Sequence, residues 1–200
     1  MLSTQAAFSS RIQLAGFTLP ELLCAMAIFS ILVTAGIPSM MNFFKRYEAE
    51  ITFRSFKNIA SYARVEAITR RRDVVLCPRK ANTEECGTGA GDGWKQGWLL
   101  FVDRGDSPTD ITAADGDVLL KVYESVADDI DIELGGSTGS SRLDYIRFMA
   151  RGNSFPSNPS ALFCQKDSDD VVNFAGKIII FRGRLRVEDS IVSKGECDAL

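Results

Sequence analysis

The 200-residue sequence contains no histidine. This absence removes the commonest general base of enzymes and the commonest neutral metal ligand. The C-x-x-C spacing that many zinc sites share is also missing. Because a nucleophile activated by a neighbouring base has no evident candidates, we expect no enzyme, no cofactor and no metal site.

Charge is absent over a long stretch of the chain. No Asp, Glu, Lys or Arg occurs from Leu22 to Phe44. A helix of that length, at about 1.5 Å per residue, can cross a ~30 Å hydrocarbon layer. We therefore expect a transmembrane helix. Two plain interpretations are a single-pass anchor and a secretory signal peptide with a loose cleavage site at 33–35, although only Arg11 supplies a cation before the apolar run.

A carboxylate stands at the entrance of this apolar segment. Glu21 follows the sequence Gly-Phe-Thr-Leu-Pro at 16–20, and an ionisable group in such a place is costly and usually functional. Neither a signal peptide nor a plain anchor explains it. The pattern resembles the processing site of type IV prepilins, in which a peptidase cuts after the glycine and the new N-terminal phenylalanine is N-methylated.

The resemblance implies roles for three residues. Prepilin peptidase would cleave between Gly16 and Phe17, which removes the leader 1–16 and leaves N-methylated Phe17 as the N-terminus. The Glu21 carboxylate would pair with a neighbouring subunit's N-terminus, and this offsets the cost of placing both charges near lipid. The resemblance also implies a single-pass anchor in the inner membrane and a periplasmic head that joins a pilus or pseudopilus.

After the apolar run, the hydrophobic pattern predicts a continuing helix and then a β-rich head. Phe56, Ile59, Ala60, Ala63 and Ala67 recur every three or four residues. We expect an apolar helix over 17–44, its amphipathic continuation over 45–72, where arginines at 70–72 suit the carbonyl end, and a head over 73–200. Predicted strands are 74–76, 98–102, 118–123, 130–134, 145–149 and 177–181, the last of them running on into 183–186.

The cysteine pattern suits an exported domain. Cys24 lies in the apolar run and serves as a small hydrophobic residue. An even number remains in the head: Cys77, Cys86, Cys164 and Cys197. In an oxidising compartment this indicates two disulfides, for which three connectivities exist. We favour Cys77–Cys86, which closes a short Gly-rich loop, and Cys164–Cys197, which ties down the C-terminal tail; a zinc site is the alternative.

The order of motifs along the head narrows the resemblance. The sequences at 63–68, 74–77, 97–103 and 146–148 precede Phe-Cys at 163–164 and Gly-Arg-Leu-Arg at 183–186. This succession resembles the minor pilin and pseudopilin group that includes FimT, FimU and the H pseudopilin of type II secretion. It implies an α+β, type IV pilin-like fold with a long helix packed on an antiparallel sheet head. The resemblance implies that the protein is a minor pilin, which assembles with other pilins into a type IV pilus and primes that assembly. The alternative is an H-type pseudopilin of a type II secretion system.

Arginines gather near the C-terminus. In a strand, Arg182, Arg184 and Arg186 would lie on one side, about 6.6–7 Å apart, and such a row suits a phosphate backbone. The G-R-x-R pattern resembles the DNA-binding motif of FimT-type pilins, so double-stranded DNA is a candidate partner. The competing interpretation is a solvated strand face, or ion pairs with Glu188 and Asp189. A net charge of −3 argues against a generic nucleic-acid-binding protein.

Two other charged clusters have plainer explanations. The arginines at 70–72, with Arg79 and Lys80, fit a helix C-terminus, and they extend a phosphate-binding surface only if folding brings them near Arg184. The aspartates between 103 and 117 offer oxygen ligands for calcium. Their spacing differs from that of an EF-hand and no bidentate Glu follows, so a solvated loop is the default expectation.

Overall fold

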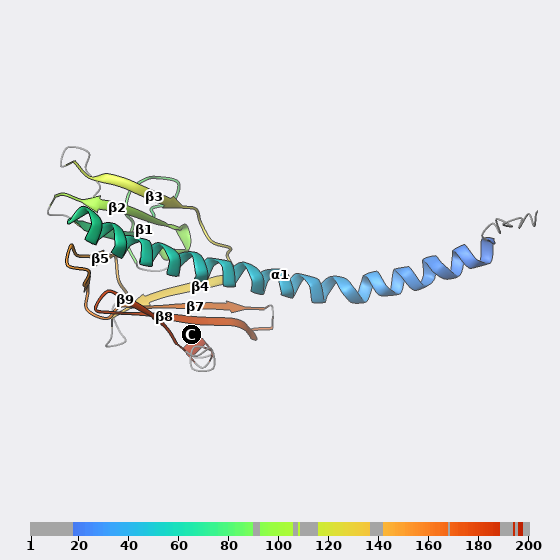
Figure 1. Cartoon of the computed structure of the whole chain (residues 1–200). Helices are drawn as coiled ribbons and strands as arrows, with labels where there is room; N and C mark the ends of the chain where they lie inside the picture. The colour runs from blue at the N-terminus through green and yellow to red at the C-terminus, as the bar shows by residue number, and fades with distance from the viewer. Residues whose placement is uncertain are drawn as a thin grey trace, which may run out of the picture. The chain divides into compact units, whose positions relative to one another are not determined.

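The computed structural model describes residues 18–89, 93–105, 108, 116–136, 142–167, 169–188, 194 and 196–197, with only the backbone described at 35–39. The chain divides into two compact units, the first ending at Met41 and the second beginning at Asn42. Helix α1 (Leu19–Arg70) contributes residues to both units (Figure 1). Gly16 and Phe17, the residues of the predicted cleavage site, lie outside the described residues.

The second unit contains two antiparallel sheets. One has the strand order β3-β2-β1-β5-β6 and the other β4-β7-β8-β9. A short 3₁₀ helix, η1 (Gly93–Gln96), precedes β2. The strands are β1 (Asp73–Pro78), β2 (Trp98–Asp103), β3 (Val118–Tyr123), β4 (Ile130–Gly135), β5 (Ile146–Phe148), β6 (Ser154–Phe155), β7 (Ser160–Lys166), β8 (Val172–Phe181) and β9 (Arg184–Val187).

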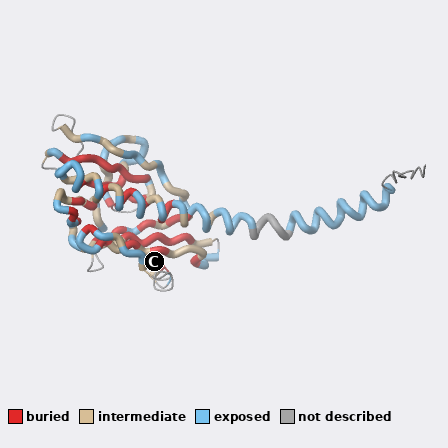
Figure 2. Tube along the Cα trace, in the orientation of Figure 1, coloured by how far each residue is buried: buried red, intermediate tan, exposed pale blue. Residues whose placement is uncertain are grey.

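The part of α1 that belongs to the second unit packs against both sheets. The Phe56 ring centroid lies 5.3 Å from that of Trp98 on β2 and 5.3 Å from that of Phe163 on β7. Ala60 and Ala63 on the same face are fully buried, and their small side chains let the helix backbone approach the sheets closely. Figure 2 shows the buried stretches of the helix and of the strands. The helical face predicted from the sequence is therefore the face that meets the core.

The sequence pattern does not predict one of the central strands, β7. β7 lies between β4 and β8, yet its sequence does not alternate and contains Gln165, which is fully buried. The Gln165 side-chain amide donates to the Lys166 carbonyl at 2.7 Å and to the Asp129 carboxylate at 3.4 Å. These bonds offset the cost of burying the amide nitrogen, so a polar residue can occupy the interior of a central strand.

Two disulfides hold the head together. Cys77 is bonded to Cys86 and Cys164 to Cys197, which is the predicted connectivity. These pairings leave the head cysteines with no role as zinc ligands. Around the second disulfide, Leu162 and Val172 form a small buried cluster on the outer side of the second sheet. The end of the chain is thus attached to β7 by a covalent bond and by apolar packing.

The length and hydropathy of the described helices can be compared with those that a membrane span requires. Within the described part of the chain, no helix combines the length and the apolar character that crossing a membrane requires. Of the predicted transmembrane helix over 17–44, Phe17 and the side chains at 35–39 lie outside the described part.

Candidate functional site

The first unit presents an apolar helical surface with one acidic residue at its start. Glu21 lies in the first turn of α1 and is exposed. Charged residues do not follow until after Phe44. The large apolar side chains that the structure describes in the first unit are exposed: Leu19, Leu22, Leu23, Met26, Ile28, Phe29, Ile31, Leu32, Val33, Met40 and Met41. Exposed apolar surface of this extent is typical of segments that bind other proteins or lipid.

Two hydroxyl side chains in the described part of this helix, Ser30 and Thr34, are satisfied by the helix itself. The Ser30 hydroxyl donates to the Met26 carbonyl at 2.8 Å, and the Thr34 hydroxyl donates to the carbonyls of Ser30 and Ile31. Because these hydroxyls need no water, the surface can enter an apolar environment without leaving their donors unpaired. Glu21 is charged, so in such an environment it would require a charged partner from outside the helix.

The second candidate site is the hairpin formed by β8 and β9. Phe181 pairs with Arg184 and Ile179 with Arg186, so the loop between the strands has two residues, Arg182 and Gly183. Their φ angles are 50° and 78°, as a type I′ hairpin turn requires. The predicted continuous strand is therefore wrong at this point. Arg184 and Arg186 share one side of β9, but Arg182 lies in the turn and does not continue their row.

Gly183 lets the hairpin pack against the rest of the head. A Cβ atom at this position would lie 2.0 Å from the Gly152 carbonyl oxygen. The Gly183 N–H donates to the Ser154 hydroxyl at 3.2 Å, and the Arg64 side chain donates to the Gly152 carbonyl at 2.9 Å. The glycine therefore allows a close approach between two backbone segments, and this approach occurs in a turn.

Phe181 is a residue of this site that the sequence analysis does not identify. Its side chain is exposed, and the guanidinium carbons of Arg182 and Arg186 lie 5.5 Å and 5.7 Å from its ring centroid. Such contacts favour particular arginine conformations. The signal in the sequence is the Phe-Arg-Gly-Arg order, because a two-residue turn places Phe181 directly opposite Arg184.

The acidic neighbour expected to neutralise these arginines has another partner. The Glu188 carboxylate lies 3.3 Å from the Lys177 ammonium, which also contacts Glu196 at 2.5 Å. Burial lowers the pKa of Lys177, but the hydrogen bonds to Glu196 and Glu188 outweigh it, and the pKa is raised overall. Arg184 and Arg186 form no ion pair with another described residue. Asp189, the other predicted partner, lies outside the described part.

The other basic cluster is divided by the fold. Arg79 and Lys80 lie beyond the far end of β1 from the arginines at 70–72, a strand length of about 20 Å. They form ion pairs there with Glu124 and Glu85. Arg70 pairs with Glu66 at the end of α1, so the helix-terminus interpretation holds for that residue.

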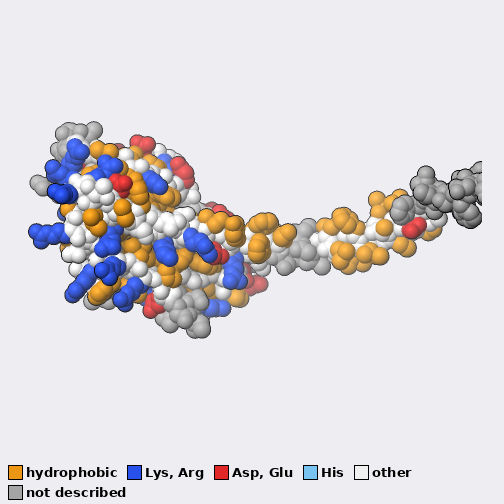
Figure 3. Space-filling model, viewed as in Figure 1, with side chains coloured by type: hydrophobic (Ala, Val, Ile, Leu, Met, Phe, Trp, Pro, Cys, Tyr) orange, Lys and Arg blue, Asp and Glu red, His pale blue; other side chains and the backbone are white. Residues whose placement is uncertain are grey.

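The end of α1 nevertheless lies close to the hairpin. Gly152 contacts the side chains of both Arg64 and Ile68 on α1, and Gly183 packs on the same Gly152. Figure 3 shows Lys and Arg side chains gathered over this end of the head. The fold therefore brings the turn of the hairpin next to the last turns of α1, which lead to Arg71 and Arg72.

A polar hollow of about 380 Å³ lies beside the last turn of α1. It is lined by Asp73, Asp103, Gly105 and the arginines Arg71, Arg72, Arg104 and Arg147. Arg147 lies between the two carboxylates, 3.5 Å from that of Asp103 and 4.0 Å from that of Asp73. Burial raises the pKa of Asp103, and the attraction of Arg147 only partly counters it. Arg147 is thus largely neutralised, and Arg71, Arg72 and Arg104 contribute the excess positive charge.

The calcium hypothesis concerns residues that are largely outside the described part. Asp106, Asp110 and Asp115 are not described, whereas the Asp117 carboxylate accepts a hydrogen bond from the Arg104 N–H at 2.7 Å. Among the described residues, no group of three or more acidic or cysteine side chains is arranged to hold a metal ion.

Comparison with known proteins agrees with this architecture. Among solved structures, the type IV minor pilin FimU of Pseudomonas aeruginosa is similar, with a TM-score of 0.52 and 18% identity over 74% of this chain and 94% of that chain. The minor pseudopilin EpsH of the Vibrio cholerae type 2 secretion system has a TM-score of 0.45 and 12% identity over 70% and 96%. No curated protein matches the sequence.

Two family comparisons cover complementary parts of the chain. Residues 15–37 match the prokaryotic N-terminal methylation motif, the region of the predicted processing site and of Glu21. Residues 52–176 match a second family, and this stretch includes the last turns of α1 and most of both sheets. This second match extends over more than half of the length of the chain. The chain therefore belongs to the family described as Type II transport protein GspH.

Proposed function

We propose that this protein is a minor pilin that prepilin peptidase cleaves between Gly16 and Phe17, and that then assembles into a type IV pilus and primes its growth. Before assembly, the N-terminal helix anchors the chain in the inner membrane and the head is periplasmic. In the filament, the same helix packs among the helices of other pilins. Phe17 carries the N-methyl group.

The observation that carries this proposal is the exposed apolar surface of α1 directly after the N-methylation motif. The GspH family and this motif make the chain a pilin or pseudopilin subunit. The FimU structure, a type IV minor pilin, has a similar fold. A helix that is apolar over so long a stretch gains free energy by packing against other apolar helices.

Glu21 provides the test of assembly. We expect Glu21→Ala to be cleaved normally but to enter filaments at least about tenfold less, because the N-terminal amine of a neighbour loses its charged partner in an apolar setting. Sheared filaments are quantified by immunoblotting, and mass spectrometry reports the processed N-terminus. Glu48→Ala, an exposed carboxylate farther along α1, is the matched control. Normal filament levels of Glu21→Ala would refute this role.

The alternative is an H-type pseudopilin of a type II secretion system, which the description of the matched family favours. Deletion of the gene separates the two. Loss of surface pili with normal protein secretion supports the pilin, and loss of secretion with normal pili supports the pseudopilin.

A second function, DNA binding by the β8–β9 hairpin, is favoured by its exposed arginines. Arg184 and Arg186 share one side of β9 and lack ion pairs to described residues, and the turn that precedes them packs beside the last turns of α1. We expect duplex DNA affinity that falls with salt and is lost in Arg184→Gln/Arg186→Gln, since phosphate contacts release counterions. Lys57→Gln/Lys80→Gln removes the same charge elsewhere and serves as the control. An unchanged salt slope in the arginine variant would exclude this surface.

A further inference from the structure

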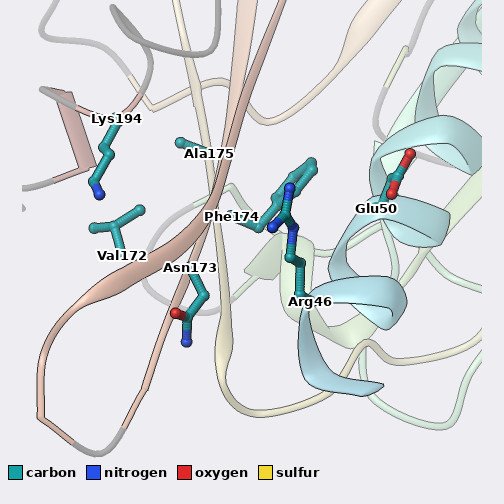
Figure 4. A pocket seen from close by; sticks show the side chains of 7 residues that line it. All are labelled: Arg46, Glu50, Val172, Asn173, Phe174, Ala175 and Lys194. Carbon is teal, nitrogen blue, oxygen red and sulfur yellow. The ribbon is translucent and has the colours of Figure 1, made fainter. Parts of the chain in front are cut away.

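A pocket of about 360 Å³ lies between the start of the second unit's helix and the beginning of β8. Arg46 and Glu50 of α1 line one side, β8 contributes residues 172–175, and Lys194 near the C-terminus completes it. Figure 4 shows these side chains around the beginning of β8. None of the sites described above uses this pocket.

Two cations of this pocket are available to a ligand. Arg46 and Lys194 are exposed and form no ion pair with another described residue. The acidic residue of the pocket, Glu50, accepts two hydrogen bonds from Arg54, at 2.6 Å and 3.0 Å. The pocket is therefore deficient in negative charge and suits an anion.

Apolar residues form another part of the pocket lining. Val172, Phe174 and Ala175 belong to β8, and the Phe174 ring is held by an edge contact with Phe53 of α1, with centroids 5.8 Å apart. A ligand with a charged head and an adjoining apolar part matches this combination better than a fully solvated ion does. The shape and charge together favour an amphiphile that carries a phosphate.

The position of the pocket along α1 indicates where such a ligand would come from. Arg46 is the second residue after Phe44, where the charge-free stretch ends, and Glu50 is about 9 Å along the helix axis from that point. Basic residues directly after an apolar segment lie at the level of lipid phosphates. The neighbouring cation, Lys45, is already paired with Asp129 at 3.4 Å, so Arg46 is the one directed to a ligand.

We propose that this pocket binds the phosphate of an anionic phospholipid headgroup, with Arg46 and Lys194 as its cationic contacts from the two sides of the beginning of β8, and with β8 itself against the glycerol and first acyl carbons (Figure 4). The inference rests on the proposed membrane anchoring of the chain. Its consequence is that lipid orients the head at the membrane surface until the subunit enters a filament, where the lipid is left behind.

The test uses the full chain in detergent micelles and dioctanoyl phosphatidylglycerol as the probe. We expect saturable binding, with phosphatidylcholine of the same chain length and inorganic phosphate each at least about tenfold weaker. Arg46→Gln/Lys194→Gln should weaken phosphatidylglycerol binding about tenfold or more, because each cation contributes to holding an anionic lipid. Lys194→Gln alone is expected to have a smaller effect. Lys57→Gln/Lys80→Gln should bind as the wild type does.

Three results would overturn the proposal. They are equal affinity for the two lipids, equal affinity for inorganic phosphate, and unchanged phosphatidylglycerol binding in both pocket variants. Thermal unfolding of each variant verifies that it is folded. Recovery of the wild-type chain in the membrane fraction of cells tests the anchoring separately, so a failure of the proposed function is distinguishable from a failure of the pocket.

Discussion

At Gly183 the backbone leaves no room for a side chain. Its φ angle is 78°, and an added Cβ would meet the Gly152 carbonyl oxygen at 2.0 Å. We expect Gly183→Ala to lower the free energy of unfolding by more than about 1 kcal/mol, since both the positive φ and the clash oppose it. Urea unfolding measures this effect. Gly136→Ala is the control, because nothing lies within 4 Å of its added Cβ, and equal values for both variants would contradict the argument.

Asp103 makes the stability of the head depend on pH. Its side chain is 3% exposed, and burial raises its pKa above the ordinary value of 3.8. The folded protein thus binds this proton more tightly than the unfolded chain does. The stabilisation is fully present below pH 3.8 and is lost as the pH rises through the raised pKa. In Asp103→Asn, the free energy of unfolding, measured with urea, should lack this decline with rising pH. If the free energies of the variant and the wild type changed with pH in parallel, this role of Asp103 would be contradicted.

At the scale of elements, the two disulfides should differ in their contribution. The two cysteines of the Cys164–Cys197 disulfide are separated by 33 positions in the sequence, and those of Cys77–Cys86 by only 9. In the chain-entropy account, the longer loop stabilises by about 3.7 kcal/mol and the shorter by about 2.6 kcal/mol. We expect alanine replacement of the 164/197 pair to cost about 1 kcal/mol more than replacement of the 77/86 pair. Chemical denaturation of both double variants tests this, and the reverse order would be inconsistent with the entropic argument.

At the scale of the whole molecule, the second unit contains its own core. All the described strands and the buried face of α1 lie between Asn42 and Leu200. We expect the fragment 42–200 to unfold cooperatively, with a Tm close to that of the full chain in detergent. A fragment that begins at Arg54 lacks buried Ala49 and Phe53 and should lose about 3 kcal/mol or more. Calorimetry compares the two fragments, and similar stabilities would show that this part of the helix is dispensable.

Local sequence signals account for much of the architecture. The spacing of Phe56, Ile59 and Ala63 predicts the buried helical face because a helix repeats every 3.6 residues, and these side chains are buried. β3 agrees with the prediction at both ends. β7 could not be predicted, since the hydrogen bonds that accommodate Gln165 come partly from Asp129, far away in the sequence.

For the candidate sites, too, some features follow from the sequence and others depend on the tertiary structure. The charge-free stretch and the position of Glu21 at its start were determined by the sequence itself, because both depend on residue type and on separation along the chain. The sequence allowed three cysteine pairings, and the structure selected the favoured one. Only the tertiary structure decided that Arg182 lies in a turn, that Gly183 packs on Gly152, and that Arg46 meets Lys194 at one pocket. The physical reason is that these contacts join residues from distant segments, and their geometry depends on how helix, sheets and C-terminal tail pack together.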